Sequence, residues 1–105
     1  MGYIYNTGPE CEFFLFKKEN DEYTVTPNDA AGYFDLSHRD LAEGVRADIS
    51  LALDALGIKT YTSHHEVSDG QHEINFKYSD ALTVADSVIT LKYAVSYTHL
   101  TLPTN

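Results

Sequence analysis

The dipeptide Asp69-Gly70 separates two runs that are typical of β-strands, and it restricts the fold of this chain more than any other feature. Asp-Gly favours the two-residue turn of a β-hairpin because glycine adopts positive φ without steric cost. A turn centred there pairs Val67 with His72 and Glu66 with Glu73. Like charges on facing strand positions oppose folding, because their Cβ atoms lie only about 4.5 to 5.5 Å apart. We therefore expect a cation between Glu66 and Glu73.

A second acidic pair, Glu10 and Glu12, lies in the apolar run from Glu10 to Phe16. Side chains alternate faces along a strand, so the two glutamates point the same way, about 6.6 Å apart, and Cys11 points the opposite way into the packing. The run predicts a strand buried on both faces, where carboxylates are costly unless they are paired or bind metal. Oxygen ligands without thiolates favour Mg²⁺ or Mn²⁺. The alternative is that all four glutamates are solvated surface charges.

The rest of the chain predicts an α+β fold, with an antiparallel or mixed sheet and two helices on one face. Further strands are expected near residues 23–25, 58–67 and 72–78, and residues 17–20 read as a turn. The first helix is expected to begin with Ser37 as N-cap and to end at Gly57, and the second to be capped by Ser79. Their predicted buried stripes are Leu41, Val45, Ile49, Leu53 and Leu56, then Leu82, Ala85, Ile89 and Tyr93.

Composition restricts the class of protein. A chain of 105 residues forms at most one small domain. Its net charge of −9 argues against a nucleic-acid or anionic-membrane partner. The single cysteine excludes an internal disulfide and a multi-cysteine zinc site. Because no apolar run approaches the roughly 18 residues of a membrane span, we expect a soluble cytoplasmic protein.

The order of several segments resembles a known enzyme family. The segments are GPECEFFLF, GYFDL, SHHEV, GQHEINFKYSDAL and ITLKY, and they follow the order and approximate spacing of bacterial type I glutamine synthetase. The resemblance makes residues 1–94 a part of that catalytic domain. It implies ATP-dependent ligation of ammonia to glutamate through a γ-glutamyl phosphate, in a homododecamer whose active sites lie between subunits. A fragment would then be inactive and would not assemble. The alternatives are a glutamate–polyamine or other amine ligase of this family, and a non-catalytic cation-binding homologue.

The resemblance also implies roles for individual residues. It assigns Glu12, Glu66 and Glu73 to one Mg²⁺ or Mn²⁺ site and Glu10 to a second, with ATP as substrate. It assigns Glu66 and Tyr33 to the ammonium pocket, and Phe76, Lys77 and Tyr78 to the nucleotide site. By strand alternation, His64 shares the face of Glu66, on the phosphate side of the site, whereas His65 and His72 point away. Packing is an alternative role for Tyr33 and Tyr78, and a hydrogen-bonded core position is an alternative for His64.

Residues 95–105 depart abruptly from the family pattern. They resemble one reading frame of a sequencing-library adapter, which predicts a non-native tail, and the fold prediction therefore leaves them out. The alternative is a genuine divergent tail.

Overall fold

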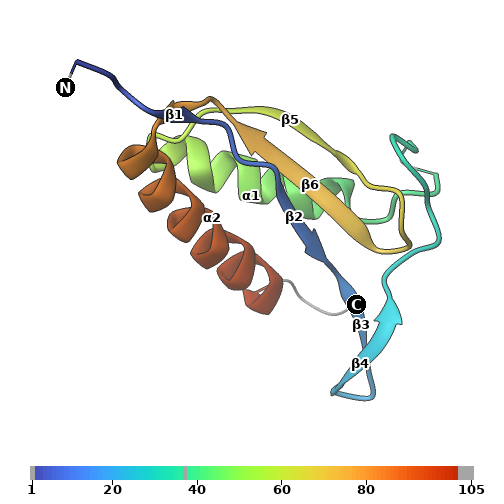
Figure 1. Cartoon of the computed structure of the whole chain (residues 1–105). Helices are drawn as coiled ribbons and strands as arrows, with labels where there is room; N and C mark the ends of the chain where they lie inside the picture. Colours follow the sequence, from blue (N-terminus) through green and yellow to red (C-terminus); the bar gives the residue numbers. More distant parts are fainter. Residues whose placement is uncertain (1, 37, 102–105) are drawn as a thin grey trace.

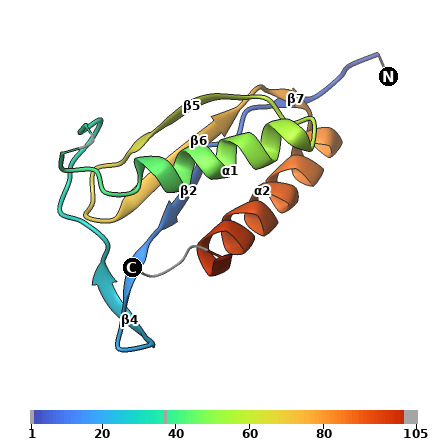
Figure 2. The same ribbon diagram turned by 180° about the vertical axis from the view of Figure 1, so that it is seen from behind.

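The computed structural model describes residues 2–36 and 38–101. Their elements are β1 (Asn6–Thr7), β2 (Cys11–Phe14), β3 (Phe16–Glu19), β4 (Glu22–Pro27), α1 (Glu43–Ala55), β5 (Thr60–His65), β6 (Gln71–Phe76), β7 (Ser79–Asp80) and α2 (Ala81–Thr101). Three strands form an antiparallel sheet in the order β2-β6-β5. Figures 1 and 2 show α1 and α2 on the same side of this sheet. The α+β prediction, with two helices on one face, is confirmed.

The core lies between this sheet and the two helices. Its buried members are Ile74 and Phe76 from β6, Ile49 and Leu53 from α1, and Val84, Leu91 and Ala94 from α2. Cys11 and Phe13 of β2 pack against this cluster, as expected for the face opposite Glu12. Because both helices cover the same face, the other face of β2, β6 and β5 is left for the acidic side chains.

The register of the hairpin differs from the prediction. Gln71 N donates to Ser68 O at 3.0 Å, so the turn is centred on Asp69 and Gly70 as expected. However, Glu66 N donates to Gln71 O at 2.7 Å, and Glu73 lies opposite His64 rather than Glu66. The tip is therefore wider than a two-residue turn. Because the register moved by two residues, and strand faces alternate with period two, Glu66 and Glu73 remain on one face.

Contacts from other parts of the chain explain the wider tip. Leu15 N donates to Gly70 O at 2.9 Å, and Gly70 N donates to Asp29 Oδ1 at 3.1 Å. Gly70 has φ +68°, and a Cβ placed there would lie 2.8 Å from Leu15 O. The conformation of the hairpin tip is therefore fixed by the contacts of Gly70 with Leu15 and Asp29.

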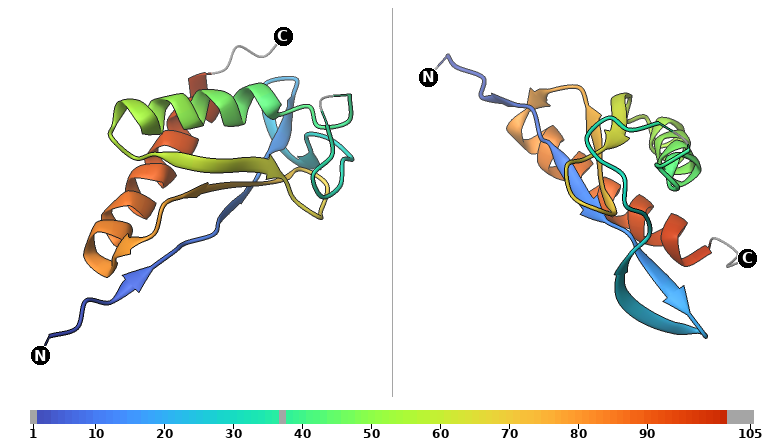
Figure 3. Two further views of the ribbon diagram at one scale, coloured as in Figure 1. Left: turned by 90° about the horizontal axis from the view of Figure 1, so that it is seen from above. Right: turned by 90° about the vertical axis from the view of Figure 1, so that its right-hand side faces the viewer.

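The predicted strand from Glu10 to Phe16 is shorter and less buried than expected. It ends at Phe14, and Glu10, Glu12 and Phe14 are exposed. The reason is its position: β2 is an edge strand with one face covered by helices. Residues 17–20 are also not simply a turn, since β3 and β4 form an arm that projects from the sheet (Figure 3). That arm turns at Asn20 and Asp21, both with positive φ.

The first helix begins later than predicted, at Glu43 with Ala42 as N-cap. Ser37, the predicted cap, lies outside the described residues. Ala42 N donates to Asp40 Oδ1 and Leu41 N donates to Asp29 Oδ2. These bonds hold residues 40–42, the lead-in of α1, outside the helix. Gly57, with φ +84°, follows the C-terminus as predicted. Ile49 and Leu53 are buried, whereas Leu41 and Leu56 are exposed.

The second helix is capped by Asp80 rather than Ser79, because Thr83 N donates to Asp80 Oδ1 at 3.1 Å. Its predicted stripe is wrong: Leu82 and Tyr93 are each 74% exposed and Ile89 is 53% exposed. Val84, Leu91 and Ala94 are buried instead. The helix is apolar on more than one face, so its pattern alone does not select the buried one. Among the described residues, no helix has the length and apolar character needed to cross a membrane.

Candidate functional site

Two carboxylates and one imidazole meet on the face of the sheet that the helices leave free. The ligand atoms of His64, Glu66 and Glu73 lie within 4.8 Å of one another, and all three residues are buried. His64 Nδ1 is 3.5 Å from Glu66 Oε1, and its Nε2 is 3.6 Å from Glu73 Oε2. Strand alternation produces this grouping, since His64 and Glu66 are two residues apart and Glu73 faces His64 on the next strand.

Glu12 lies beside this group and Glu10 does not join it. Glu12 is directly opposite Glu73 in the β2–β6 register, and its Oε2 accepts a hydrogen bond from Gln71 Nε2 at 3.0 Å. Glu10 lies one residue before β2 and is exposed, in a groove between β2 and α2. The structure thus brings three of the four predicted glutamates to neighbouring positions on one face.

The donor set fits a hard divalent cation. Carboxylate oxygens suit Mg²⁺ or Mn²⁺, and closely placed carboxylates repel one another without a cation. Asn75 Nδ2 donates to Glu73 Oε1 at 2.7 Å, which orients that carboxylate. The Oδ1 atom of Asn75 is buried and has no hydrogen-bond partner among the described residues. This buried acceptor lies close to the Glu73 carboxylate, and the hydroxyl of Thr62, which faces Asn75 across the β5–β6 pair, is likewise buried without a partner among the described residues.

Aromatic side chains from the loop before α1 close one side of the group. The Phe34 ring stacks on His64 with centroids 4.2 Å apart, and Tyr33 meets His64 edge-on at 5.5 Å. Phe34 has φ +56°, which is unusual for a bulky side chain. Its N–H donates to His65 O at 3.0 Å, so the strained backbone is held against the strand. Tyr33 thus contacts His64, and His64 in turn lies beside the carboxylates of Glu66 and Glu73.

The predicted nucleotide segment is made of the last residue of β6, Phe76, and the two residues that follow it. The Phe76 ring belongs to the core and the whole residue is only 3% exposed, so very little of it is open to a ligand. Lys77 and Tyr78 are exposed. All three line a cavity of about 290 Å³ together with Lys59 and Ser87.

A second buried group lies on the opposite face of the hairpin, and sequence reasoning missed it. His65 Nε2 lies 2.8 Å from Asp29 Oδ1, and His65 Nδ1 lies 2.6 Å from Glu66 O. Both neighbours only accept hydrogen bonds, so both ring nitrogens carry protons. Burial alone would lower the pKa of His65, but the hydrogen bonds and charge of Asp29 and the Glu66 carbonyl outweigh it and raise that pKa. The same bonds hold the pKa of Asp29 below its usual value, although burial opposes them.

His72 faces His65 but is neutral. Its Nδ1 lies 2.9 Å from Arg46 Nη1, which can only donate, and its Nε2 lies 3.2 Å from Asn28 Oδ1. Burial, together with the charges of Arg46 and His65, lowers the pKa of His72 to about 4. Arg46 also forms a buried ion pair with Asp40, whose pKa it lowers against the effect of burial.

This second group does not suit a metal, although Asp29, His65 and His72 lie as close together as metal ligands would. The His72 lone pair already faces a guanidinium, and both His65 nitrogens carry protons. One sequence signal could have revealed the group: Arg46, Ile49 and Leu53 have the spacing of one helix face, so a charge lies on the buried stripe.

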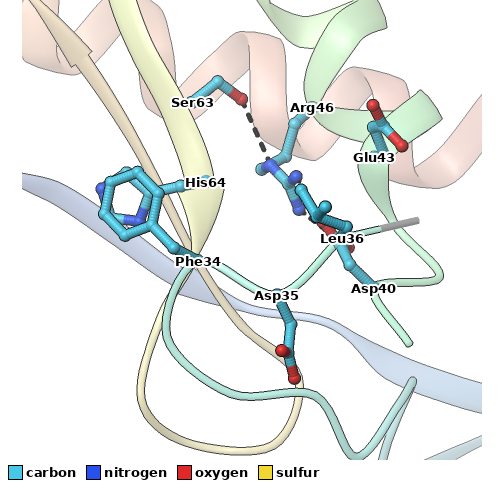
Figure 4. A pocket seen from close by; sticks show the side chains of 8 residues that line it. All are labelled: Phe34, Asp35, Leu36, Asp40, Glu43, Arg46, Ser63 and His64. Carbon is cyan, nitrogen blue, oxygen red and sulfur yellow. Dashed lines mark hydrogen bonds and ion pairs between the residues drawn. The ribbon is translucent and has the colours of Figure 1, made fainter. Parts of the chain in front are cut away.

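Figure 4 shows a pocket of about 250 Å³ next to His64, where the Arg46 side chain reaches from α1 toward Ser63 on β5. Arg46 Nε donates to Ser63 Oγ at 3.2 Å, and Asp40 pairs with the same guanidinium. Asp35 accepts from Gly32 N and pairs with Arg39. These charged groups bind one another, so we assign no chemistry to this pocket.

Comparison with known proteins identifies the family of the chain. A family model described as the catalytic domain of glutamine synthetase matches residues 1–99. Glutamine synthetase of Clostridium saccharobutylicum is 54% identical over 96 residues, which are 90% of this chain and 22% of that protein. The enzyme of Halobacterium salinarum is 53% identical over 96 residues, covering 90% and 21%. The chain therefore spans about a fifth of the length of these curated relatives.

Solved structures give the same result. The cryo-EM structure of Plasmodium falciparum glutamine synthetase matches with a TM-score of 0.74 and 26% identity, covering 90% of this chain and 24% of that one. A GmaS complex with ADP matches with a TM-score of 0.72 and 30% identity, covering 90% and 22%. Sequence and fold agree over nearly the whole chain, and this chain belongs to the glutamine synthetase catalytic-domain family.

Proposed function

We propose that the whole protein ligates ammonia to glutamate at the expense of ATP, through a γ-glutamyl phosphate, with Mg²⁺ or Mn²⁺ at its site. The observation that carries this proposal is the buried group of His64, Glu66 and Glu73, with Glu12 directly opposite Glu73. Identity of 54% to a curated glutamine synthetase over 90% of the chain supports the same reaction.

The carboxylates have separate roles in this proposal. Glu12, Glu66 and Glu73 would hold one divalent cation, and Glu10 would contribute to a second. Such cations, when bound, neutralise negative charge on the phosphoryl group that is transferred. His64 lies between Glu66 and Glu73, where a proton donor can contact a phosphate oxygen. Asn75 keeps Glu73 oriented through its 2.7 Å hydrogen bond.

Glu66 and Tyr33 form the proposed ammonium pocket. A carboxylate favours the ammonium cation and can accept the proton that ammonium must lose before it attacks. The Tyr33 ring lies against His64, which in turn lies next to Glu66. The rings of Tyr33 and Phe34 pack against His64 and so fix the imidazole beside the carboxylates.

Phe76, Lys77 and Tyr78 form the proposed nucleotide contact. Lys77 and Tyr78 line the cavity after β6, where an ammonium and an aromatic ring suit a phosphate and a purine. The similarity to GmaS in its ADP complex supports nucleotide binding by this fold. Phe76 itself lies in the core, so its contribution would be to hold Lys77 and Tyr78 in place beside this cavity.

We propose a cytoplasmic enzyme that assembles as a homododecamer, and we propose that this chain alone neither assembles nor turns over substrate. Residues 1–94 would be the family segment and residues 95–105 a non-native tail, even though the family model extends to residue 99 and α2 continues to Thr101. The codons of the tail test the last point, because codons that do not spell the adapter contradict it.

The test of function is an assay of the protein encoded by the complete reading frame. We expect glutamine formation that requires ATP, ammonium and a divalent cation, and loss of that activity in the Glu66→Gln variant. Polyamines and other amines should be offered in parallel, because faster turnover with them would favour an amine ligase. No turnover with any acceptor, in a folded assembly, would favour a non-catalytic cation-binding protein.

A further inference from the structure

One buried pair joins three segments that lie next to the candidate ammonium site. Asp29 accepts four hydrogen bonds: from His65 and Gly70 N on Oδ1, and from Leu41 N and Asn28 Nδ2 on Oδ2. Gly70 belongs to the hairpin tip, Leu41 to the lead-in of α1, and His65 to the end of β5. The carboxylate is buried, with 1% of its side chain exposed.

His65 continues these connections toward the site. Its Nδ1 contacts Glu66 O at 2.6 Å, and its own carbonyl accepts from Phe34 N at 3.0 Å and lies 3.1 Å from His64 Nδ1. The positions of Glu66, His64 and Phe34 therefore all depend on the place of one residue. His65 itself is completely buried.

We propose that Asp29 and His65 act as a positioning pair, which holds the main chain at Glu66 and Phe34 so that the Glu66 carboxylate and the Tyr33–Phe34 aromatic wall meet at His64. This inference rests on the proposed function, because it concerns the same cation site. Neither residue contacts the acidic group on the open face with its side chain, so both act through the backbone. Groups that hydrogen-bond directly to a metal ligand typically change metal affinity about 10- to 100-fold when they are removed, and for a pair that acts through the main chain we expect the lower end of that range.

Asp29→Asn tests the pair, with Asp40→Asn as the matched control. Both variants remove one buried carboxylate from the same network, but Asp40 pairs with Arg46 and makes no hydrogen bond to the hairpin tip or to His65 among the described residues. Mn²⁺ binding to this chain is measured from the loss of the free Mn²⁺ EPR signal, at a temperature where circular dichroism shows each variant folded. We expect Asp29→Asn to bind Mn²⁺ about 10-fold more weakly or worse, and Asp40→Asn to bind as the unmodified chain does.

A second readout does not depend on metal. NMR of the metal-free protein should show altered ring-current shifts for Phe34 and His64, and faster exchange of the Gly70 amide, in Asp29→Asn but not in Asp40→Asn. If Asp29→Asn fails to fold, His65→Gln replaces it, since glutamine can still donate to Asp29 but cannot also reach the Glu66 carbonyl.

The possible outcomes separate the two proposals. Unchanged Mn²⁺ affinity in folded Asp29→Asn, with normal binding by the unmodified chain, overturns the positioning role and leaves the proposed function standing. Equal weakening in Asp40→Asn also overturns it, because general loosening would then explain the effect. If the unmodified chain binds no Mn²⁺, the cation site of the proposed function fails, and the positioning role fails with it even where the NMR shifts change.

Discussion

His65 and His72 lie directly opposite each other on β5 and β6, with ring centroids 4.8 Å apart, yet their pKa values move in opposite directions. The difference follows from their partners. His65 lies between a carboxylate and a carbonyl, whereas His72 lies beside a guanidinium. One ring is thus charged and its neighbour neutral in the same buried group.

This relationship predicts how stability depends on pH. His72 has a folded pKa of about 4 against an ordinary value of 6.5, so the unfolded chain binds an extra proton between these values. The free energy of unfolding should therefore fall as pH drops from 6.5 to 4, by at most about 1.4 kcal/mol per pH unit for this proton. Urea titrations of metal-free protein measure it, and His72→Gln should flatten the slope. An unchanged slope in His72→Gln would contradict the assignment.

His65 predicts the opposite trend at higher pH. Its folded pKa is raised above 6.5, so its contribution to stability is complete below that pH and is lost as pH rises through the folded pKa. Stability should therefore be greatest near neutrality. Asp29→Asn should weaken the decline above pH 6.5, because it removes the charge that holds the proton, whereas Asp40→Asn should largely retain it. Stability that keeps rising into the alkaline range would contradict a charged His65.

Metal ions should stabilise the chain weakly. At ten times its dissociation constant, Mg²⁺ or Mn²⁺ should add about 1.4 kcal/mol, since a ligand that binds only the folded state stabilises it. Glu73→Gln should abolish this shift and, without metal, should be neutral or raise the melting temperature. The reason is that glutamine removes repulsion from Glu66 and Glu12 while keeping an oxygen that accepts from Asn75. A folded sample that melts identically with and without metal would count against coordination by these residues.

Gly70 should tolerate substitution less well than the other glycines. A Cβ there would lie 2.8 Å from Leu15 O at φ +68°, so Gly70→Ala should cost about 2–3 kcal/mol through strain and the clash. Gly57→Ala is the control for backbone strain alone, because φ is +84° with open space around it, and should cost about 1 kcal/mol. Gly44→Ala, in the first turn of α1 with open space, should stabilise by at most about 1 kcal/mol. Equal losses at Gly70 and Gly57 in chemical denaturation would show that the tip is not tightly packed.

Two leucines of α2 test which helix face is buried. Leu91→Ala should lower the free energy of unfolding by about 2–5 kcal/mol, because Leu91 is 4% exposed in the core. Leu82→Ala should change it by no more than about 0.5 kcal/mol, because Leu82 is 74% exposed. The reverse order in thermal or urea unfolding would support the stripe that the sequence predicted.

Sequence patterns were informative where the physics is local. Asp69-Gly70 predicted the turn, because few residues adopt positive φ at low cost, and Gly57 marked the end of α1 for the same reason. Helix faces were less predictable. α2 carries apolar residues on several faces, and only packing against α1 and the sheet selected Val84, Leu91 and Ala94.

The sequence by itself determined that His64, Glu66 and Glu73 share a face, because side chains alternate along strands and a register error of two residues leaves faces unchanged. It did not determine which residue lies opposite Glu73, nor the buried pair of Asp29 and His65. Those depend on contacts between segments far apart in the chain: Asp29 and Gly70 are 41 positions apart, and their hydrogen bond exists only once the hairpin tip packs on the loop before α1. Local chemistry thus placed the carboxylates on one face, and tertiary packing decided the partners and charges that surround them.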